Sequence, residues 1–198
     1  MPTPAKKQTL RVQCRQRRQA LPQNIRLPAI TAFTARAIAF LAERAPGAKC
    51  VGGYYPMPEE MDIRPLLQVM MASGANVALP LITPKNTLSF KKTTTLMPDE
   101  LVRHPNFSVM EPPMAWPDAE PQVLIVPLLG FDDNCHRLGF GGGYYDRAIA
   151  SLRAANYKVL VVGAAFECQK LSKMPSEPHD ARLDAVITEH AVYQPPKE

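Results

Sequence analysis

The chain has 198 residues, of which 46% are hydrophobic and 21% are charged. This length and composition exclude a wholly disordered chain and predict one domain over residues 1–198, because the chain is long enough for a full core but short for two. The net charge of +5 favours an anionic partner: nucleic acid, a membrane surface, or a phosphorylated or carboxylated ligand. The excess lies in residues 6–26, which contain no Asp or Glu.

The cysteine pattern and the hydropathy indicate a cytoplasmic protein. Cys14, Cys50, Cys135 and Cys168 form no C-x-x-C pair and no zinc-finger spacing. Scattered thiols of this kind fit a reducing compartment. No apolar segment typical of a signal peptide follows the basic N-terminus, and the most apolar run, residues 123–129, is too short to span a bilayer. We therefore expect no membrane partner.

Hydrophobic periodicity and turn residues divide the chain into alternating helices and strands. Helices are expected at residues 6–21, 28–45, 62–73 and 144–154, and strands at residues 49–55, 77–82, 88–90, 123–129, 158–166 and 184–188. This alternation predicts an α/β fold with an open, mostly parallel sheet flanked by helices. Pro28 is expected in the first turn of its helix, and Pro80 indicates an edge position or a bulge. Residues 83–121 are expected to wrap around the surface.

The first expected helix combines an apolar face with a basic face. Leu10 and Cys14 lie on the apolar face at helical spacing, and basic residues border it. Those basic residues are Lys7, Arg11, Arg15 and Arg18. Lys7 and Arg11 are one turn apart, so the two side chains can reach one anion together. The alternative is a solvated basic face, which is the interpretation that we keep for Arg15 and Arg18.

A glycine-rich loop, RLGFGGGYYDR at residues 137–147, lies between an expected strand and an expected helix. Glycines let the backbone approach a ligand closely, and the N–H groups at a helix start bind anions. The pattern lacks the third glycine of the dinucleotide fingerprint, and the chain has no Gly-Lys-Ser/Thr of a Walker loop. The loop therefore predicts a phosphate site of another kind. A tight turn that only packs against the sheet is the alternative.

Residues 137–147, with Val126-Pro127 and Phe131-Asp132 before them, resemble the signature of the 5-formyltetrahydrofolate cyclo-ligase family, also called the methenyltetrahydrofolate synthetase family. Further segments that agree in order and spacing are Lys7-x-x-Leu10-Arg11, Tyr55-Pro56, Glu60-Met61-Asp62-Ile63-Arg64-Pro65-Leu66, Glu111-Pro112, and a C-terminal block of Val162-Gly163, Phe166, Gln169, Pro175 and His179-Asp180. The resemblance covers nearly the whole chain. Cys135 departs from it, because the family has a glycine there, and Phe140 stands where some members have a basic residue.

The resemblance implies an ATP- and Mg²⁺-dependent ligase. Its reaction converts 5-formyltetrahydrofolate to 5,10-methenyltetrahydrofolate and releases ADP and phosphate. The formyl oxygen attacks the γ-phosphate of ATP, N10 then attacks the phosphorylated intermediate, and phosphate leaves. Such chemistry depends on positioning and charge neutralisation more than on a protein nucleophile. A monomer or weak homodimer that acts on these small molecules, without nucleic acid, is expected.

The same resemblance assigns a role to each candidate site residue. ATP binding falls to Lys7, Arg11, Arg137, Leu138, Gly139, Gly141, Gly142, Gly143, Tyr144 and Tyr145. Binding of the folate falls to Arg11, Tyr55, Glu60, Phe140 and Tyr144. The expected catalytic residues are Arg137 and Tyr145, and the expected Mg²⁺ ligands are Asp146 and Asp180. We expect His179 to be a surface residue rather than a ligand.

Each role has a structural alternative. Asp146 and Glu60 could each only stabilise the N-terminus of a helix. Arg137 could form a structural ion pair with Asp132 or Asp133, and Tyr144 could only pack in the core. For the protein as a whole, one alternative is an RNA-binding module led by the basic helix. The other is a sugar-phosphate isomerase or acyl-CoA transferase, since those enzymes share the fold type of the resembled family and fold alone does not decide function.

Overall fold

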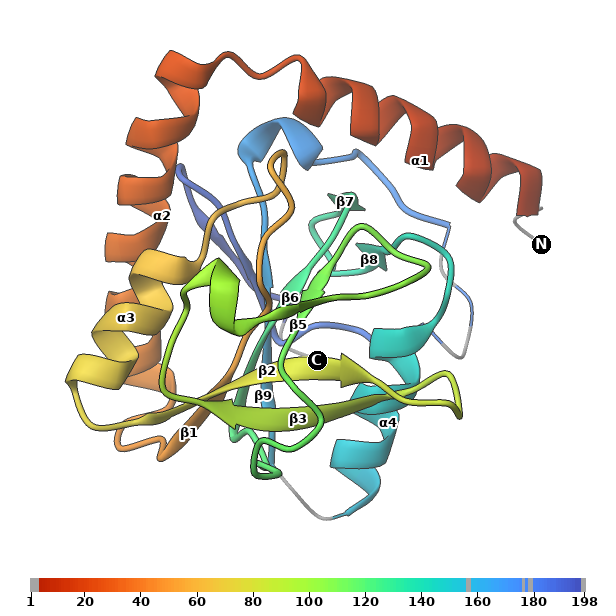
Figure 1. Ribbon diagram of the computed structural model, residues 1–198. Coiled ribbons are helices and arrows are strands. Elements are labelled where there is room, and N and C mark those ends of the chain that lie inside the picture. Colours follow the sequence, from red (N-terminus) through yellow and green to blue (C-terminus); the bar gives the residue numbers. More distant parts are fainter. Residues whose placement is uncertain (1–3, 156–157, 176, 178–179, 197–198) are drawn as a thin grey trace.

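A seven-stranded sheet forms the centre of the protein, with the strand order β11-β10-β9-β6-β1-β2-β3. The computed structural model describes residues 4–155, 158–175, 177 and 180–196 (Figure 1). The parallel strands are β1 (Cys50–Gly52), β2 (Asn76–Ile82), β6 (Val123–Pro127), β9 (Leu160–Ala164) and β10 (Ala185–Ile187). Two antiparallel strands, β3 (Leu88–Thr93) and β11 (Val192–Tyr193), complete the two edges. The predicted open, mostly parallel sheet is confirmed.

Helices cover both faces of this sheet (Figure 1). α2 (Gln23–Arg44) and α3 (Arg64–Ala72) pack on one face, and α4 (Tyr144–Ala154) packs on the other. Along β6, Val123 and Ile125 belong to the core on the α2 side, whereas Leu124 and Val126 belong to the core on the α4 side. Alternate residues of a strand point to opposite faces, so a strand covered twice must be apolar throughout. This explains the continuous apolar run that identified β6 in the sequence.

α1 (Pro4–Gln19) lies apart from these layers, across the carboxyl ends of the strands (Figure 1). It contacts the short 3₁₀ turn η2 (Glu167–Gln169) and the strand β7 (Gly130–Phe131). Cys14 anchors it, since its side chain is fully buried in a small apolar cluster with Leu129 and Leu138. The basic residues of α1 are therefore held over the end of the sheet where β1 and β6 stop.

The prediction about Pro28 is wrong, whereas Pro80 does lie where β2 is paired on one side, as an edge position requires. Pro28 lies inside α2, which begins at Gln23 directly after Pro22. β2, which contains Pro80, is an internal strand. β1 pairs with only the first three residues of β2, so at Pro80 the strand has β3 as its sole neighbour and the missing N–H breaks no ladder between β1 and β2.

The long connection at residues 94–122 contains only short elements. These are the 3₁₀ turn η1 (Pro98–Glu100) and a two-stranded ribbon of β4 (Val102–Arg103) and β5 (Met110–Glu111). The ribbon is tied to the sheet, because the buried carboxylate of Glu111 accepts a hydrogen bond from the backbone N–H of Ile82 at 2.8 Å. The region is attached to the sheet at further points, since the backbones of Pro117 and Ala119 bond to Lys92 and Phe90 of β3.

A second small ribbon, β7 with β8 (Arg137–Leu138), immediately precedes the glycine loop. Its turn places Cys135 in the left-handed region, with φ of +59°. Such a conformation favours glycine, which accounts for the glycine expected at this position. Burial raises the pKa of the Cys135 thiol to about 12, so it stays protonated and packs as a small apolar group.

One helix of the described chain, α2, is long and apolar enough to cross a bilayer if length and composition alone are considered. By contrast, the apolar run at residues 123–129 is too short to span a bilayer. Phe33, Ala37 and Leu41 of α2 pack in the main core, which is also the behaviour of a core helix in a layered domain.

Candidate functional site

A cavity of about 1150 Å³ opens at the carboxyl ends of β1 and β6. The chain adds β2 on one side of β1 and later places β6 on the other, so the direction of strand addition reverses between these two strands. Ligands of open α/β sheets bind at such a reversal, beyond the carboxyl ends of the strands. All the site residues named from the sequence line this one cavity: Lys7, Arg11, Tyr55, Glu60, residues 137–146 and Asp180.

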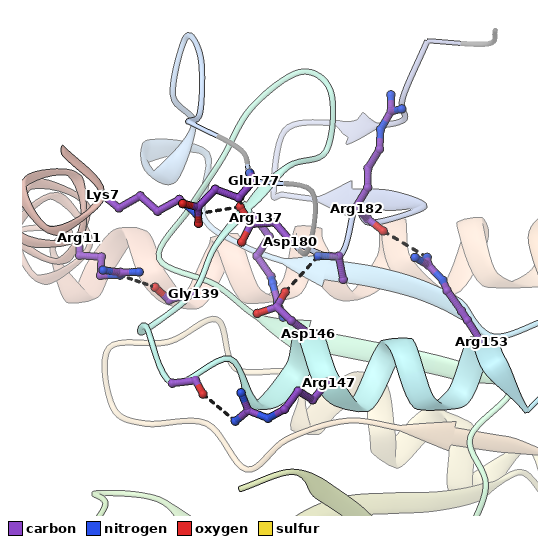
Figure 2. Close-up of polar contacts among 12 residues, drawn as sticks. Lys7, Arg11, Arg137, Gly139, Asp146, Arg147, Arg153, Glu177, Asp180 and Arg182 are labelled. Carbon is purple, nitrogen blue, oxygen red and sulfur yellow. Dashed lines mark hydrogen bonds and ion pairs between the residues drawn. The ribbon is translucent and has the colours of Figure 1, made fainter. Parts of the chain in front are cut away.

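α1 provides one wall of the cavity through Lys7, Arg11 and Arg15. The Nε of Arg11 donates to the carbonyl oxygen of Gly139 at 3.0 Å, so this side chain docks on the glycine loop (Figure 2). Arg18 does not lie on a solvated face, because it is buried with 1% of its surface exposed and pairs with Glu59. That expectation was wrong: periodicity places a residue on a helix face but does not show which acidic partner will cover it.

The glycine loop has the backbone geometry that its sequence requires. Gly141 and Gly143 have φ of +107° and +67°, values that side chains other than glycine rarely adopt. Gly143 is the residue before α4, whose first turn carries N–H groups without an intrahelical partner and the positive end of the helix dipole. Leu138 is buried, so it offers the cavity backbone rather than side chain. The loop therefore presents a cradle suited to phosphate.

Arg137, Tyr145 and Asp146 form a contact group at the base of this loop. The Nη2 of Arg137 donates to Oδ1 of Asp146 at 2.5 Å, and the guanidinium lies over the ring of Tyr145 at 5.6 Å. Arg137 is 8% exposed, and its buried Nε has no hydrogen-bond partner among the described residues. A buried unsatisfied donor is costly and is commonly completed by a ligand. Arg137 pairs with Asp146, not with Asp132 or Asp133 as the structural alternative supposed.

Tyr145 is suited to donating a hydrogen bond, not to accepting a proton. Burial raises the pKa of its hydroxyl, and the charge of Glu60 raises it further, whereas Arg137 lowers it. The hydroxyl is therefore protonated at neutral pH. A neutral phenol next to a guanidinium can orient an anion but cannot act as a general base.

Glu177 and Asp180 line the cavity together with Lys7 of α1. Lys7 pairs with Glu177 at 2.6 Å and with Asp180 at 2.8 Å, and Asp146 accepts the backbone N–H of Ala181 at 3.1 Å (Figure 2). Burial alone would lower the pKa of Lys7, but these two carboxylates raise it overall. Lys7 is thus fully positive, and its ion pairs join α1 to Glu177 and Asp180. His179 lies outside the described residues.

Asp146 and Asp180 are brought to the same side of the cavity, where both were expected to bind Mg²⁺. The described residues contain no group of three or more His, Cys, Asp and Glu that could hold a metal ion alone. Mg²⁺ in nucleotide sites usually takes one or two carboxylates, with phosphates and water completing the shell. The two aspartates therefore fit a Mg²⁺ that arrives with phosphate, although Asp146 is paired with Arg137 and Asp180 with Lys7.

The side of the cavity that is formed by the loop after β1 is less basic than the glycine loop and α1. Glu60 is 6% exposed, and its Oε2 accepts the backbone N–H of Met57 at 2.9 Å. Burial raises the pKa of Glu60 to about 7, while this hydrogen bond and the charge of Arg18 lower it. Tyr55 receives a hydrogen bond from Arg64 at 3.2 Å. A carboxylate among aromatic and apolar side chains suits a flat ring with N–H donors.

Phe140 and Tyr144 complete the aromatic lining. Phe140 projects from the glycine loop and is 42% exposed, and the guanidinium of Arg18 lies 5.7 Å from the centre of its ring. Tyr144 meets the edge of Phe107, with ring centroids 5.9 Å apart, so it faces the cavity and is not simply a core residue. Trp116 packs against the main core and does not line the cavity.

Sequence reasoning missed several residues of this site. Phe107 and Glu111 line the cavity from the β4–β5 ribbon, and Glu177 lines it beside Lys7. No motif surrounds Phe107, so only the fold reveals it, whereas Glu177 lies between Pro175 and His179 of the C-terminal block of the resemblance and could have been suspected from it. Glu111 was noted as a landmark of the resemblance without a role.

The basic residues of α1 divide into three groups. Lys7, Arg11 and Arg15 line the cavity, and Arg18 is buried against acidic residues. Lys6 and Arg17 are exposed outside the cavity.

The sequence and the fold match one family. Residues 3–189 match the model of the 5-formyltetrahydrofolate cyclo-ligase family. The chain is 33% identical over 151 residues to the 5-formyltetrahydrofolate cyclo-ligase of Escherichia coli, covering 74% of this chain and 81% of that protein. It is 30% identical over 188 residues to the enzyme of the same name from Haemophilus influenzae, covering 92% of this chain and 97% of that protein.

Solved structures agree. A 5,10-methenyltetrahydrofolate synthetase from Mycoplasma pneumoniae matches with a TM-score of 0.74 at 23% identity, covering 92% of this chain and 98% of that one. The NMR structure of the Aquifex aeolicus 5,10-methenyltetrahydrofolate synthetase matches with a TM-score of 0.73 at 27% identity, covering 97% and 94%. With the cavity at the strand reversal and these relatives over most of its length, the chain belongs to the 5-formyltetrahydrofolate cyclo-ligase family and is an enzyme of that kind.

Proposed function

We propose that the enzyme uses ATP and Mg²⁺ to convert 5-formyltetrahydrofolate to 5,10-methenyltetrahydrofolate, with release of ADP and phosphate. The whole chain would act as one catalytic domain, as a monomer or weak homodimer in the cytoplasm. The observation that carries the proposal is the meeting of two unlike surfaces in one cavity. One is basic and rich in glycine, and the other holds a buried carboxylate among aromatic rings.

ATP would occupy the basic side. The backbone of Gly139–Tyr145 and the N-terminus of α4 would receive the phosphates, with Lys7, Arg11 and Arg137 neutralising their charge. The unsatisfied Nε of Arg137 would gain a phosphate oxygen as its acceptor. Lys7 would exchange part of its contact with Asp180 for the nucleotide.

Magnesium would be held by Asp146 and Asp180 together with the phosphates. When bound, it neutralises charge on the transferred phosphoryl group. Asp146 accepts both of its hydrogen bonds, from Arg137 and from Ala181, through Oδ1. Its carboxylate is therefore oriented by two fixed donors, as metal-binding carboxylates usually are.

The folate would occupy the side of the cavity that is formed by the loop after β1. Glu60 would accept hydrogen bonds from the N–H groups of the pterin ring, and Tyr55, Phe140 and Tyr144 would hold the ring between apolar surfaces. Arg11, whose side chain bonds to Gly139 of the glycine loop, would contact both ligands.

In this arrangement the protein contributes position and charge. The formyl oxygen of the folate would face the γ-phosphate, with Arg137 stabilising the charge that gathers on the transferred group and Tyr145 donating a hydrogen bond. N10 would then attack the formyl carbon, and the carbon–oxygen bond would break as phosphate leaves. The formyl oxygen departs with the phosphate, and N10 releases its proton as the methenyl bridge forms, so each atom is accounted for.

A direct assay tests this proposal. Purified protein with Mg²⁺, ATP and 5-formyltetrahydrofolate is expected to produce the absorbance of the methenyl form, with one ADP released for each molecule formed. Tetrahydrofolate without the formyl group is the control and is expected to release no ADP. Absence of the methenyl absorbance in the complete mixture would refute the proposed reaction.

A further inference from the structure

Arg18 is a fully buried cation to which none of the expected substrate contacts is assigned. Its Nη2 pairs with Glu59 at 3.2 Å, and its Nη1 donates to the carbonyl oxygen of Leu128 at 3.4 Å and lies 3.8 Å from Glu60. The backbone oxygen of Arg18 is itself held by Arg26. A charge is rarely buried unless it is paired, so these contacts identify a built cluster and not an incidental one.

The contacts of Arg18 join three segments of the chain that lie around the cavity. Arg18 belongs to α1, Glu59 and Glu60 belong to the loop after β1, and Leu128 follows β6. Its guanidinium also faces the ring of Phe140 in the glycine loop at 5.7 Å. Arg18 does not line the cavity itself, whereas Glu59, Glu60 and Phe140 do. It therefore reaches the site through the residues that it holds.

The charge of Glu60 depends on this neighbour. The titratable groups that face Glu60 are Arg18 from α1, Glu59 beside it, Tyr54 after β1, and Tyr145 from α4. Arg18 is the only cation among them, and it favours the ionised carboxyl, whereas burial and Glu59 favour the neutral one. An ionised carboxylate accepts two hydrogen bonds, but a protonated one loses part of that capacity.

We propose that Arg18 is a positioning residue for the folate, which keeps Glu60 oriented and ionised beneath the pterin ring without touching the substrate. This inference rests on the function proposed above. The competing explanation is that Arg18 only fastens α1 to the sheet. In that case its loss would disturb Lys7 and Arg11 on the same helix, and ATP binding would suffer at least as much as folate binding.

The test measures two equilibria by titration calorimetry on the full chain between pH 6 and pH 9: binding of 5-formyltetrahydrofolate alone and binding of MgATP alone. In the unmodified protein the affinity for 5-formyltetrahydrofolate should rise as the pH passes through about 7, where Glu60 ionises. Arg18→Met removes the cation and should move this midpoint upward by about one pH unit. At pH 7 it should weaken folate binding about fivefold, because the ionised fraction of Glu60 falls from about one half to about one tenth, while MgATP binding changes less than about threefold.

Two further variants separate charge from anchoring. Arg18→Lys keeps the charge and should keep the midpoint near that of the unmodified protein. Glu59→Gln breaks the same Arg18–Glu59 ion pair but removes a negative neighbour of Glu60, so its midpoint should move downward. Arg17→Met is the matched control, since it removes an exposed charge from the next position of α1, and neither equilibrium should change.

Opposite shifts in Arg18→Met and Glu59→Gln, with MgATP binding preserved, support the proposal. Equal loss of MgATP and folate binding in Arg18→Met, or a midpoint that stays in place, overturns it. If Arg18→Met does not fold, Glu59→Gln and Arg18→Lys decide alone, because a downward shift in the first with a retained midpoint in the second is still required. Failure of the unmodified protein to bind 5-formyltetrahydrofolate would instead refute the proposed function.

Discussion

Arg137→Met is expected to lower kcat about a thousandfold, because it removes the cation that we propose faces the transferred phosphoryl group. Arg137 combines three features that few surface arginines share. It is almost fully buried, it is held by Asp146 and by the ring of Tyr145, and its Nε has no partner among the described residues. The loss should appear mainly in kcat, since the charge on the phosphoryl group develops in the transition state.

The measurement is steady-state turnover of 5-formyltetrahydrofolate at saturating MgATP, with circular dichroism as a check on folding. Arg153→Met is the matched control, because Arg153 is partly exposed on the outer part of α4 and bonds to Arg182 and Asp184, away from the cavity (Figure 2). It should keep kcat within about twofold of the unmodified value. A folded Arg137→Met variant with kcat within threefold of normal would show that Arg137 has no part in phosphoryl transfer.

Asp146→Asn should lower kcat by about 100-fold at ordinary Mg²⁺ concentration, because the negative charge that favours the metal ion is lost. The amide keeps an oxygen that can accept from the N–H of Ala181, so Ala181 should stay in place. The unfolding temperature should therefore change little. Raising the Mg²⁺ concentration should recover part of the activity, since the variant weakens metal binding without removing Asp180.

Turnover measured against Mg²⁺ concentration gives the answer. Asp133→Asn is the control, since Asp133 is 65% exposed and pairs with Lys170 outside the cavity. If Asp146→Asn turned over normally, or if its defect were the same at every Mg²⁺ concentration, the metal role of Asp146 would be refuted.

The elements that were predicted best are those whose limits are fixed by local chemistry. α4 has the predicted bounds, residues 144–154, because the left-handed Gly143 ends the loop directly before it. β6 was identified from its apolar run, since both of its faces are covered. The position of the glycine loop was likewise predicted from the sequence, because positive φ values at Gly141 and Gly143 require glycine.

The features that were missed depend on partners far away in the chain. The burial of Arg18 depends on Glu59, which is 41 positions away, and the place of Glu177 depends on Lys7 at the other end of the chain. Helical periodicity assigns a face but carries no information on such pairs. The start of α2 was misplaced for a related reason, since the packing of Arg26 and Ala29 outweighs the local preference of Pro28 for a first turn.

The central claim is that one cavity brings the formyl oxygen of the folate to the γ-phosphate of ATP. Labelling that oxygen tests it most directly. With 5-formyltetrahydrofolate carrying ¹⁸O in the formyl group, mass spectrometry of the released phosphate should find one ¹⁸O in each phosphate formed, in step with the methenyl product. Unlabelled phosphate, with the ¹⁸O found in water instead, would mean that ATP is hydrolysed separately and would contradict direct transfer to the formyl oxygen.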